Sequence, residues 1–238
     1  MIAEALIAAA LGATGCGPTI VIDPGHDLRA NPATEPIGPG SKRRKIKDGG
    51  GTRGVVTGTP EHVVNLRISL LLRDELSARG YCVVMTRTTS SGRSVGNVAR
   101  ARIANRAGAA LFVRVHADGS TDRSRRGTSM LYPALHRGWT DDVLPESNTA
   151  ARVIQGELRS ALGSRDLGIV PRSDLTGFNW SDVPVVLAEV GFLSNPAEDR
   201  LLNSRAYQRR AARGLAQGIA RTVKTASNDS PGATMRSP

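Results

Sequence analysis

The sequence is poor in aromatic residues, in cysteine and in long apolar runs, and each shortage excludes a class of protein. Phe, Tyr and Trp make up 3% of the 238 residues, so a core must consist mainly of Val, Leu, Ile and Ala. Two cysteines without a CxxC motif do not make a disulfide scaffold. No stretch reaches the roughly 18 apolar residues of a membrane-spanning helix, so we predict no stable membrane span.

Acidic residues are also in deficit, because 32 Lys and Arg outnumber 21 Asp and Glu and leave a net charge of +11. Such a surface favours anionic partners, which keeps a basic protein that binds nucleic acid or another anionic polymer as an alternative. Proteins that bind single-stranded nucleic acid also need aromatic side chains beside the basic groove, on which the bases stack. The few aromatic residues here are scattered, so we predict no nucleic-acid partner.

The two ends of the chain and the two cysteines are less informative. Residues 1–18 contain a short apolar stretch like that of a signal peptide, but no positive segment precedes it. The letters "ATGC" resemble a lipoprotein cleavage site, so lipid attachment at Cys16 stays open. Cys82 lies in the apolar run "YCVVM" and is predicted to be a buried free thiol, because a Cys16–Cys82 disulfide requires an oxidising compartment. Residues 226–238 are predicted to be disordered.

Strand-like apolar runs alternate with helical patterns along the chain, which is typical of an α/β protein with a largely parallel sheet. The alternation continues without a linker and predicts one domain over residues 19–225. The expected strands cover residues 19–23, 81–87, 110–115, 127–133 and 183–193. The expected helices cover residues 60–80, 94–108, 145–163 and 203–225.

Residues 27–59 are rich in Gly, Pro and Lys and are too long for an ordinary connection between a strand and a helix. They include the basic run "SKRRKIKDGGGTRG". We interpret the stretch as a mobile surface insertion. We favour a solvated run of charges over a rim that attracts an acidic substrate.

Two of the four histidines follow strand-like runs directly. His26 comes after the first expected strand, and His116 comes after the third. In α/β sheets, ligands bind beyond the carboxyl ends of the strands. We therefore expect the two imidazoles to share one site.

Two carboxylates are expected at the same edge of the sheet. Glu61 lies in the first turn of the first helix, where His62 is a competing ligand, since adjacent helical residues point about 100° apart. Glu189 interrupts the apolar run "VPVVLAEVGFL". A carboxylate in such a strand is costly to bury unless it is paired, hydrogen-bonded or linked to a metal.

Two imidazoles and one carboxylate form a ligand set that suits Zn²⁺, with a water in the fourth position of a catalytic site. Zinc lowers the pKa of that water, and a further carboxylate can take its proton and pass it to a leaving amine. The residues therefore indicate metal-dependent hydrolysis of an amide or ester.

Four motifs resemble, in order, those of the zinc-dependent N-acetylmuramoyl-L-alanine amidases of the Amidase_3 type. These motifs are "VIDPGH", "EHVVNL", "RVHADG" and "LAEVGFLSNP". The resemblance covers residues 19–225 and is strongest to mycobacterial and actinobacterial single-domain members, which also have an Asp at the position of Asp118. It implies a three-layer α/β fold, with a twisted, mostly parallel six-stranded sheet flanked by helices.

The resemblance also implies roles for individual residues. His26, Glu61 and His116 would bind one zinc ion, which selects Glu61 over His62, and Glu189 would be the catalytic carboxylate. Asp23 is predicted either to orient His26 or to shape the turn before Pro and Gly. The segment "RSDLTGFNW" is similar to the family segment beside the substrate peptide, which implies substrate contacts for Arg172 and Leu175.

The implied reaction is hydrolysis of the amide between N-acetylmuramic acid and L-alanine of the peptidoglycan stem peptide, by a zinc-bound water with Glu189 as base. Its substrate lies outside the cytoplasmic membrane, so we expect a secreted or wall-associated monomer. We see no added wall-binding repeat, and the amphipathic helix between Gly119 and Gly168 is needed for the fold, so we expect an uninhibited catalytic domain. A zinc peptidase that cuts within a cell-wall peptide and an inactive wall-binding module are alternatives.

Overall fold

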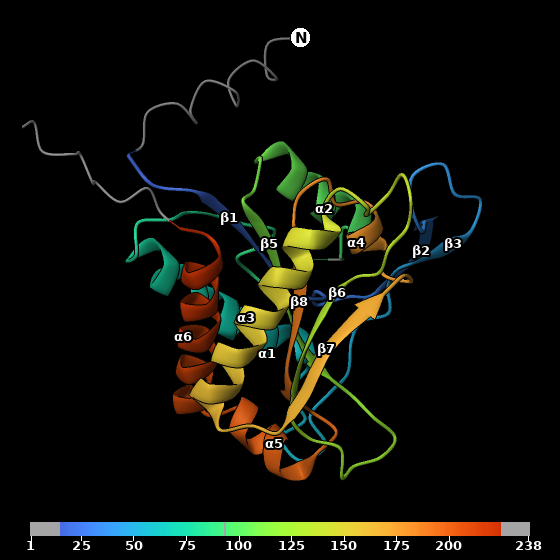
Figure 1. Cartoon of the computed structure of the whole chain (residues 1–238). Helices are drawn as coiled ribbons and strands as arrows, with labels where there is room; N and C mark the ends of the chain where they lie inside the picture. The colour runs from blue at the N-terminus through green and yellow to red at the C-terminus, as the bar shows by residue number, and fades with distance from the viewer. Residues whose placement is uncertain (1–14, 93, 225–238) are drawn as a thin grey trace, which may run out of the picture.

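A six-stranded sheet forms the middle layer of the structure, a computed structural model that describes residues 15–92 and 94–224 (Figure 1). Its strand order is β4-β1-β5-β8-β6-β7, and only the pairing of β6 with β8 is antiparallel. The predicted α/β class is therefore confirmed. The strands are β1 (Thr19–Pro24), β4 (Cys82–Met85), β5 (Leu111–Asp118), β6 (Thr128–Pro133), β7 (Asp166–Arg172) and β8 (Val185–Phe192).

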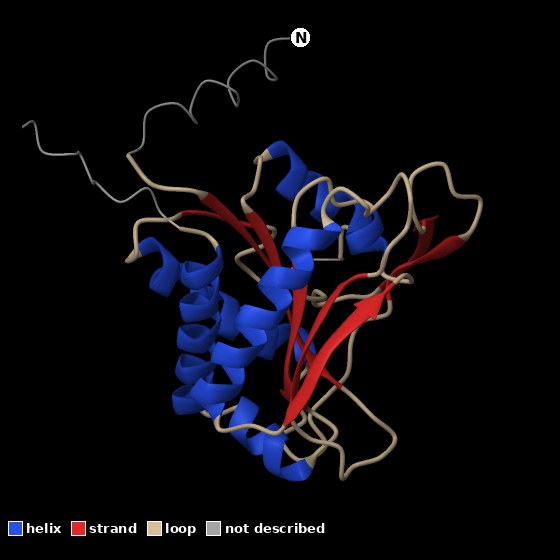
Figure 2. Cartoon of the chain, viewed as in Figure 1, coloured by secondary structure: helices blue, strands red, loops and turns tan. Residues whose placement is uncertain are grey.

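Helices cover both faces of this sheet (Figure 2). Three long helices pack on one face, two shorter ones lie on the other, and α5 follows β8. The long helices are α1 (Glu61–Ser77), α3 (Leu144–Leu162) and α6 (Arg205–Thr222). The shorter helices are α2 (Asn97–Arg106), α4 (Thr176–Asn179) and α5 (Pro196–Leu202).

Side chains alternate between the two cores along each central strand. In β5, Val113 and Val115 point to the core under α1, α3 and α6, whereas Phe112 points to the core under α2 and α4. All three are fully buried, and a buried side chain of this size contributes about 1.5–3 kcal/mol. Burial on both faces explains why the strands read as continuous apolar runs rather than alternating patterns. By the same alternation, His116 and Glu189 lie on the α2 side of the sheet.

Two parts of the sequence prediction missed secondary structure. β7 has the sequence DLGIVPR, in which Gly and Pro hide the strand pattern. The helices α4 and α5 are too short to show a helical period. The long helix between Gly119 and Gly168 is α3, which packs against α6 and β6 as a helix of the fold.

Residues 27–59 contain secondary structure that we did not expect, although most charged side chains of the basic run are exposed, as predicted. They contain an antiparallel hairpin, β2 (Asn31–Pro36) and β3 (Arg44–Asp48), followed by a loop that reaches the start of α1. The indole Nε1 of Trp180 donates to the carbonyl oxygen of Pro36 at 2.9 Å, and Ile37 is buried. The basic run is therefore exposed only in part, because the hairpin is anchored against the α4 region.

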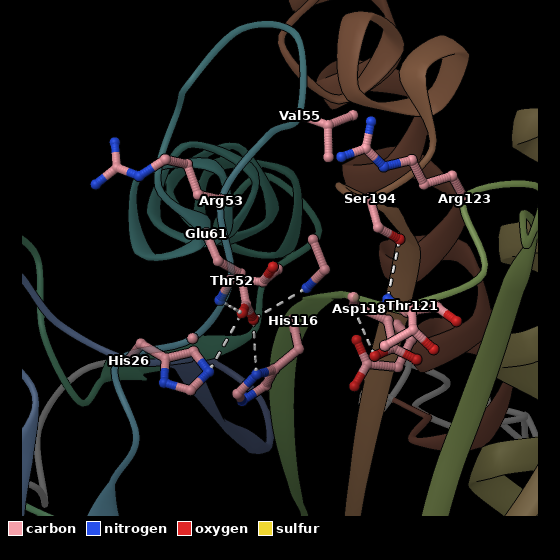
Figure 3. A pocket seen from close by; sticks show the side chains of 15 residues that line it. His26, Thr52, Arg53, Val55, Glu61, His116, Asp118, Thr121, Arg123 and Ser194 are labelled. Atoms are coloured by element: carbon pink, nitrogen blue, oxygen red, sulfur yellow. Dashed lines mark hydrogen bonds and ion pairs between the residues drawn. The ribbon is translucent and has the colours of Figure 1, made fainter.

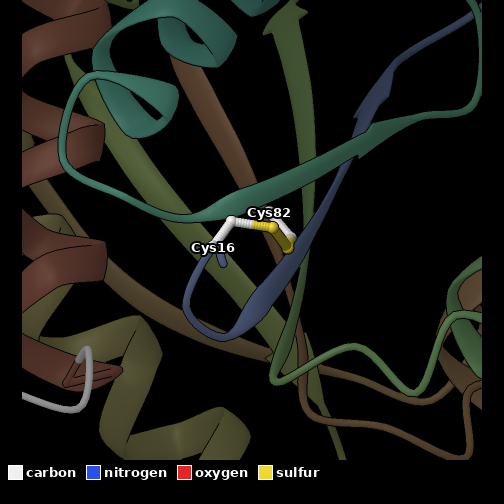
Figure 4. Close-up of a disulfide and its surroundings, with 2 residues drawn as sticks. All are labelled: Cys16 and Cys82. Carbon is white, nitrogen blue, oxygen red and sulfur yellow. A yellow bond between two sulfur atoms is a disulfide. The ribbon is translucent and has the colours of Figure 1, made fainter. Parts of the chain in front are cut away.

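Cys82 is not a free thiol, because it forms a disulfide with Cys16 (Figure 4). The Cα atoms are 5.3 Å apart, within the usual range for a disulfide. β1 and β4 are parallel neighbours, and the Cys82 amide donates to the Pro18 carbonyl at 3.2 Å. The bond uses the sulfur atom to which a lipid would be attached, so lipid attachment at Cys16 conflicts with this structure.

No helix within the described residues is long and apolar enough to cross a membrane. The signal-like segment 1–18 falls largely outside the described part of the chain, and the predicted tail 226–238 lies wholly outside it.

Candidate metal centre

His26, Glu61 and His116 come together at the carboxyl edge of the sheet (Figure 3). His26 follows β1, Glu61 is the first residue of α1, and His116 lies near the end of β5. Nε2 of His26 is 3.4 Å from Oε2 of Glu61, and Nδ1 of His116 is 3.1 Å from Oε1 of the same carboxylate. One ligand atom from each residue lies within 4.8 Å of the others. His62 instead has its Nδ1 atom 3.1 Å from Oγ of Ser90.

A tight turn delivers His26 to this cluster. The Gly25 amide donates to the Val115 carbonyl at 2.9 Å, and a Cβ atom at Gly25 would lie 2.3 Å from the His116 ring. His26 itself has φ of 59°, in the left-handed region, which costs a residue with a Cβ atom about 1–2 kcal/mol. His26 is the only non-glycine residue with positive φ in the described parts of the chain.

Asp48, at the end of β3, fixes the ring of His26. Its Oδ1 atom lies 2.5 Å from Nδ1 of His26, and its side chain is almost wholly buried. Burial lowers the pKa of His26, but the hydrogen bonds and charges of Asp48 and Glu61 outweigh burial and raise that pKa to about 10. Burial raises the pKa of Asp48, but the bonded His26 outweighs it and lowers that pKa to about 2. The ring is thus oriented with Nε2 toward Glu61.

Asp23 does not contact the His26 ring, so the predicted orienting role is not a direct one. Its carboxylate accepts hydrogen bonds from Thr86, Arg100 and Arg114. Asp23 is fully buried beneath the turn, and the guanidinium groups of Arg100 and Arg114 neutralise its charge. Asp48 occupies the place beside Nδ1 that we had considered for Asp23.

Glu61 is held as a buried carboxylate. The Thr52 amide donates to its Oε2 at 2.9 Å, and Asn65 Nδ2 donates to its Oε1 at 3.0 Å. Burial raises the pKa of Glu61, but hydrogen bonds and charges from His116 and His26 outweigh it and keep the pKa well below its usual range. Gly51 is required nearby, because a Cβ there would lie 2.6 Å from Oε2 of Glu61.

Glu189 lies opposite His116 in the β5–β8 register. Its Oε2 atom is buried and has no hydrogen-bond partner within the described structure, and no described arginine forms an ion pair with Glu189. Burial, and then the charges of Asp118 and Glu61, raise the pKa of Glu189 well above its usual value. A carboxyl group in a cleft with a perturbed pKa and one oxygen atom without a partner is a candidate for proton transfer.

The three clustered residues and Glu189 line one open cleft of about 730 Å³. Arg53, Val55 and Arg123 stand around its mouth in Figure 3. Leu175 lines a neighbouring pocket of about 230 Å³ that also reaches His26 and His116. Arg172 lies outside both lining sets, and its guanidinium pairs with Asp174, with Nε 2.7 Å from Oδ1.

Sequence reasoning missed Asp48, Thr52 and Asn65. Asp48 lies in the stretch that we interpreted as solvated. Thr52 contributes its amide rather than its side chain, which no residue pattern reveals. Asn65 lies one helical turn after Glu61, and this spacing of four residues is the signal that could have found it.

Comparison with known proteins gives the family. Residues 20–221 match the family model described as N-acetylmuramoyl-L-alanine amidase, and the chain belongs to this family. The family expected from the motifs is therefore confirmed.

Individual relatives agree with this family. The chain is 30% identical to N-acetylmuramoyl-L-alanine amidase Rv3717 of Mycobacterium tuberculosis, over 92% of this chain and 91% of the relative. It is 30% identical to AmiC of Neisseria meningitidis over 90% of this chain, and it spans only 55% of that longer protein. The crystal structure of the amidase Ami1 from Mycobacterium smegmatis superposes with a TM-score of 0.79 at 27% identity, covering 88% of this chain and 98% of Ami1.

Proposed function

We propose that this chain is a zinc-dependent peptidoglycan hydrolase that cleaves the amide between N-acetylmuramic acid and L-alanine of the stem peptide. One observation carries the proposal. The His26–Glu61–His116 cluster shares an open cleft with Glu189, whose buried Oε2 atom has no hydrogen-bond partner among the described residues. Family membership and the relatives' printed activity support the choice of amide.

The donor set fits zinc. Two imidazole nitrogens and one carboxylate are a common ligand set of catalytic zinc, and Asp48 holds the ring of His26 as carboxylates hold zinc-binding histidines. His26, Glu61 and His116 would hold the ion. When bound, zinc would polarise the substrate carbonyl and make water more acidic.

Glu189 is the proposed proton carrier. Its carboxylate would accept a proton from the attacking water and deliver it to the nitrogen of L-alanine as the C–N bond breaks. The raised pKa of Glu189 supports this role, because it makes the carboxylate a stronger proton acceptor. Asp118, at the same cleft, contributes to that raised pKa through its own charge.

The walls of the cleft suit an acidic substrate. Arg53 and Arg123 line it, and neither forms an ion pair within the described chain. We propose that they attract the carboxylates of the stem peptide. Leu175 remains a proposed substrate contact through the neighbouring pocket, and Arg172 remains one only if its pair with Asp174 opens.

We further propose that the protein acts outside the cytoplasmic membrane as a monomer. The Cys16–Cys82 disulfide supports an oxidising compartment. A zinc peptidase that cuts inside a wall peptide remains the alternative, because zinc, water and a carboxylate serve any amide.

The proposal is tested by incubating purified peptidoglycan with protein that has been stripped of metal by a chelator and then reloaded with zinc. We expect new amino groups on L-alanine to appear only with the reloaded protein. Release of other amino termini would support the peptidase instead, and equal release by the stripped protein would contradict a metal-dependent reaction.

A further inference from the structure

The backbone around His26 is held by two arginine side chains, of which Arg100 is buried and Arg87 is half-buried. Arg100 donates from Nη1 to the Pro24 carbonyl at 2.9 Å and from Nη2 to the His26 carbonyl at 3.1 Å. Arg87 donates from Nε to the Pro24 carbonyl at 3.0 Å and from Nη2 to the Gly25 carbonyl at 3.0 Å. Each of the three carbonyls in the turn therefore accepts a hydrogen bond from a guanidinium group.

Arg100 is the more buried of these two side chains, with a side-chain exposure of 4%. A buried guanidinium needs a counter-charge, and Asp23 supplies it through Oδ1. Ser94 completes the arrangement, because its hydroxyl lies 3.1 Å from Nη2, the nitrogen that also donates to His26. Asp23 thus acts on His26 through Arg100.

The conformation of His26 explains why such a support is needed. With φ of 59°, His26 holds a backbone geometry that residues with a Cβ atom rarely adopt and that persists only where the surroundings impose it. Asp48 fixes the ring, but a fixed ring on a freely moving backbone would not keep Nε2 beside Glu61.

We propose that Arg100 is a positioning residue for the metal centre, which holds His26 in the left-handed conformation that places its Nε2 atom at the ion. The proposal rests on the zinc centre of the proposed function but not on the amide that is cleaved. It assigns Asp23 the role of pairing with the Arg100 guanidinium and orienting it. The metal centre is then supported from inside the sheet by Asp23 and Arg100, and from the hairpin by Asp48.

A purely structural role for Arg100 is the competing explanation, and Arg114 provides the matched control. Arg114 donates from Nε to the other oxygen of Asp23 at 2.8 Å, and its side-chain exposure is 5%. Its second partner is Oδ1 of Asn97, at 2.7 Å, and no hydrogen bond joins its side chain to the turn of His26. Arg100 and Arg114 therefore differ mainly in contact with residues 24–26.

The experiment compares Arg100→Lys with Arg114→Lys in the full chain. Lysine keeps the charge beside Asp23 but cannot bond two carbonyls and a carboxylate with a planar fork. Zinc affinity is measured by competition with a chromophoric chelator, and the visible spectrum is recorded with Co²⁺ in place of zinc. Thermal unfolding of the metal-free proteins shows whether both variants fold and by how much each is destabilised.

We expect Arg100→Lys to bind zinc about 10- to 100-fold more weakly and to change the Co²⁺ spectrum. Arg114→Lys should keep both properties while losing similar thermal stability. Equal zinc affinities in the two variants would overturn the proposal, as would an absence of zinc binding by the unaltered protein. If the unaltered protein binds zinc but does not cleave the muramoyl amide, the proposed function fails while this proposal still stands.

A milder variant covers the case in which Arg100→Lys does not fold. Ser94→Ala removes the hydroxyl beside Nη2 of Arg100, which also bonds the Asp48 carboxylate, so the variant weakens both supports of His26. We expect a smaller but measurable loss of zinc affinity relative to the unaltered protein. Unchanged zinc affinity in a folded Ser94→Ala protein would count against the proposal.

Discussion

The Oδ1 atom of Asp48 lies 2.5 Å from Nδ1 of His26, across 22 residues of sequence and at the end of a hairpin. This contact makes the hairpin part of the candidate metal centre. It directs Nε2 of His26 toward Glu61, and it keeps a charged pair in a partly buried site when no metal is bound. A ligand histidine that is oriented in this way by a carboxylate binds zinc more tightly.

Replacing Asp48 should therefore weaken the metal centre. We expect Asp48→Asn to lower zinc affinity about 10- to 100-fold, because the neutral amide orients His26 less firmly and removes the stabilising charge. Asp27→Asn is the control, since Asp27 is adjacent to His26 but, among the described residues, its side chain bonds only the Leu28 amide. The zinc affinity of both proteins is measured at equilibrium by competition with a chromophoric chelator. Equal affinities would show that the contact has no role in metal binding.

Substitutions at Glu189 and at His26 should have different effects, the first on catalysis and the second on metal binding. We expect Glu189→Gln to retain zinc but to lose about 10²- to 10⁴-fold in turnover, because the proton carrier is lost. His26→Ala should lose the zinc itself, because one of three ligands is gone. Metal content by atomic emission and turnover on a muramoyl peptide are measured on the same samples. Substantial turnover by Glu189→Gln would remove Glu189 from the mechanism.

The metal-free protein should show a pH-dependent contribution from the His26–Asp48 pair. The pKa of His26 is raised from 6.5 to about 10, so its contribution is complete below pH 6.5 and disappears as the pH rises through 10. The pKa of Asp48 is lowered from 3.8 to about 2, so its contribution is complete above pH 3.8 and disappears as the pH falls through 2. The pair therefore stabilises the fold most between these two limits.

Urea unfolding of the unaltered protein and His26→Gln, both free of metal, measures this contribution. The difference in free energy of unfolding should be largest near pH 5 and should shrink toward pH 10. A difference that grows above pH 7 would contradict the raised pKa of His26.

The disulfide should stabilise the fold without affecting the metal centre. It joins the start of β1 to β4, at the opposite ends of these strands from His26. Cys16→Ser with Cys82→Ser should lower the free energy of unfolding by about 2–4 kcal/mol, because the link closes a loop of 66 residues. Zinc affinity should stay unchanged. Chemical unfolding and zinc competition on the double variant test both statements, and a loss of zinc binding in the folded variant would contradict the second.

The sequence predicted the site residues that lie at the carboxyl ends of strands. His26 and His116 were expected at one edge because parallel strands bring their carboxyl ends together, and the structure places them there. Helical period could not choose between Glu61 and His62, because the rotation of α1 depends on its packing against β1 and β5. The family resemblance made that choice.

The remaining features depend on contacts between distant segments, which residue patterns do not encode. The Cys16–Cys82 bond requires β1 and β4 to be neighbours, and Asp48 reaches His26 only because the hairpin folds back. β7 was missed because it contains Gly and Pro, which are uncommon in strands. It is also partly exposed, so it lacks the continuous apolar pattern of the central strands. Arg100 showed no signal because it lies on α2 and acts through the backbone of another segment.

Mass spectrometry of peptidoglycan digested by the zinc-loaded protein tests the central claim most directly. We predict free stem peptides that begin with L-alanine, together with glycan strands whose N-acetylmuramic acid has lost its peptide. Products cut inside the peptide, with L-alanine still attached to the muramic acid, would contradict the claim.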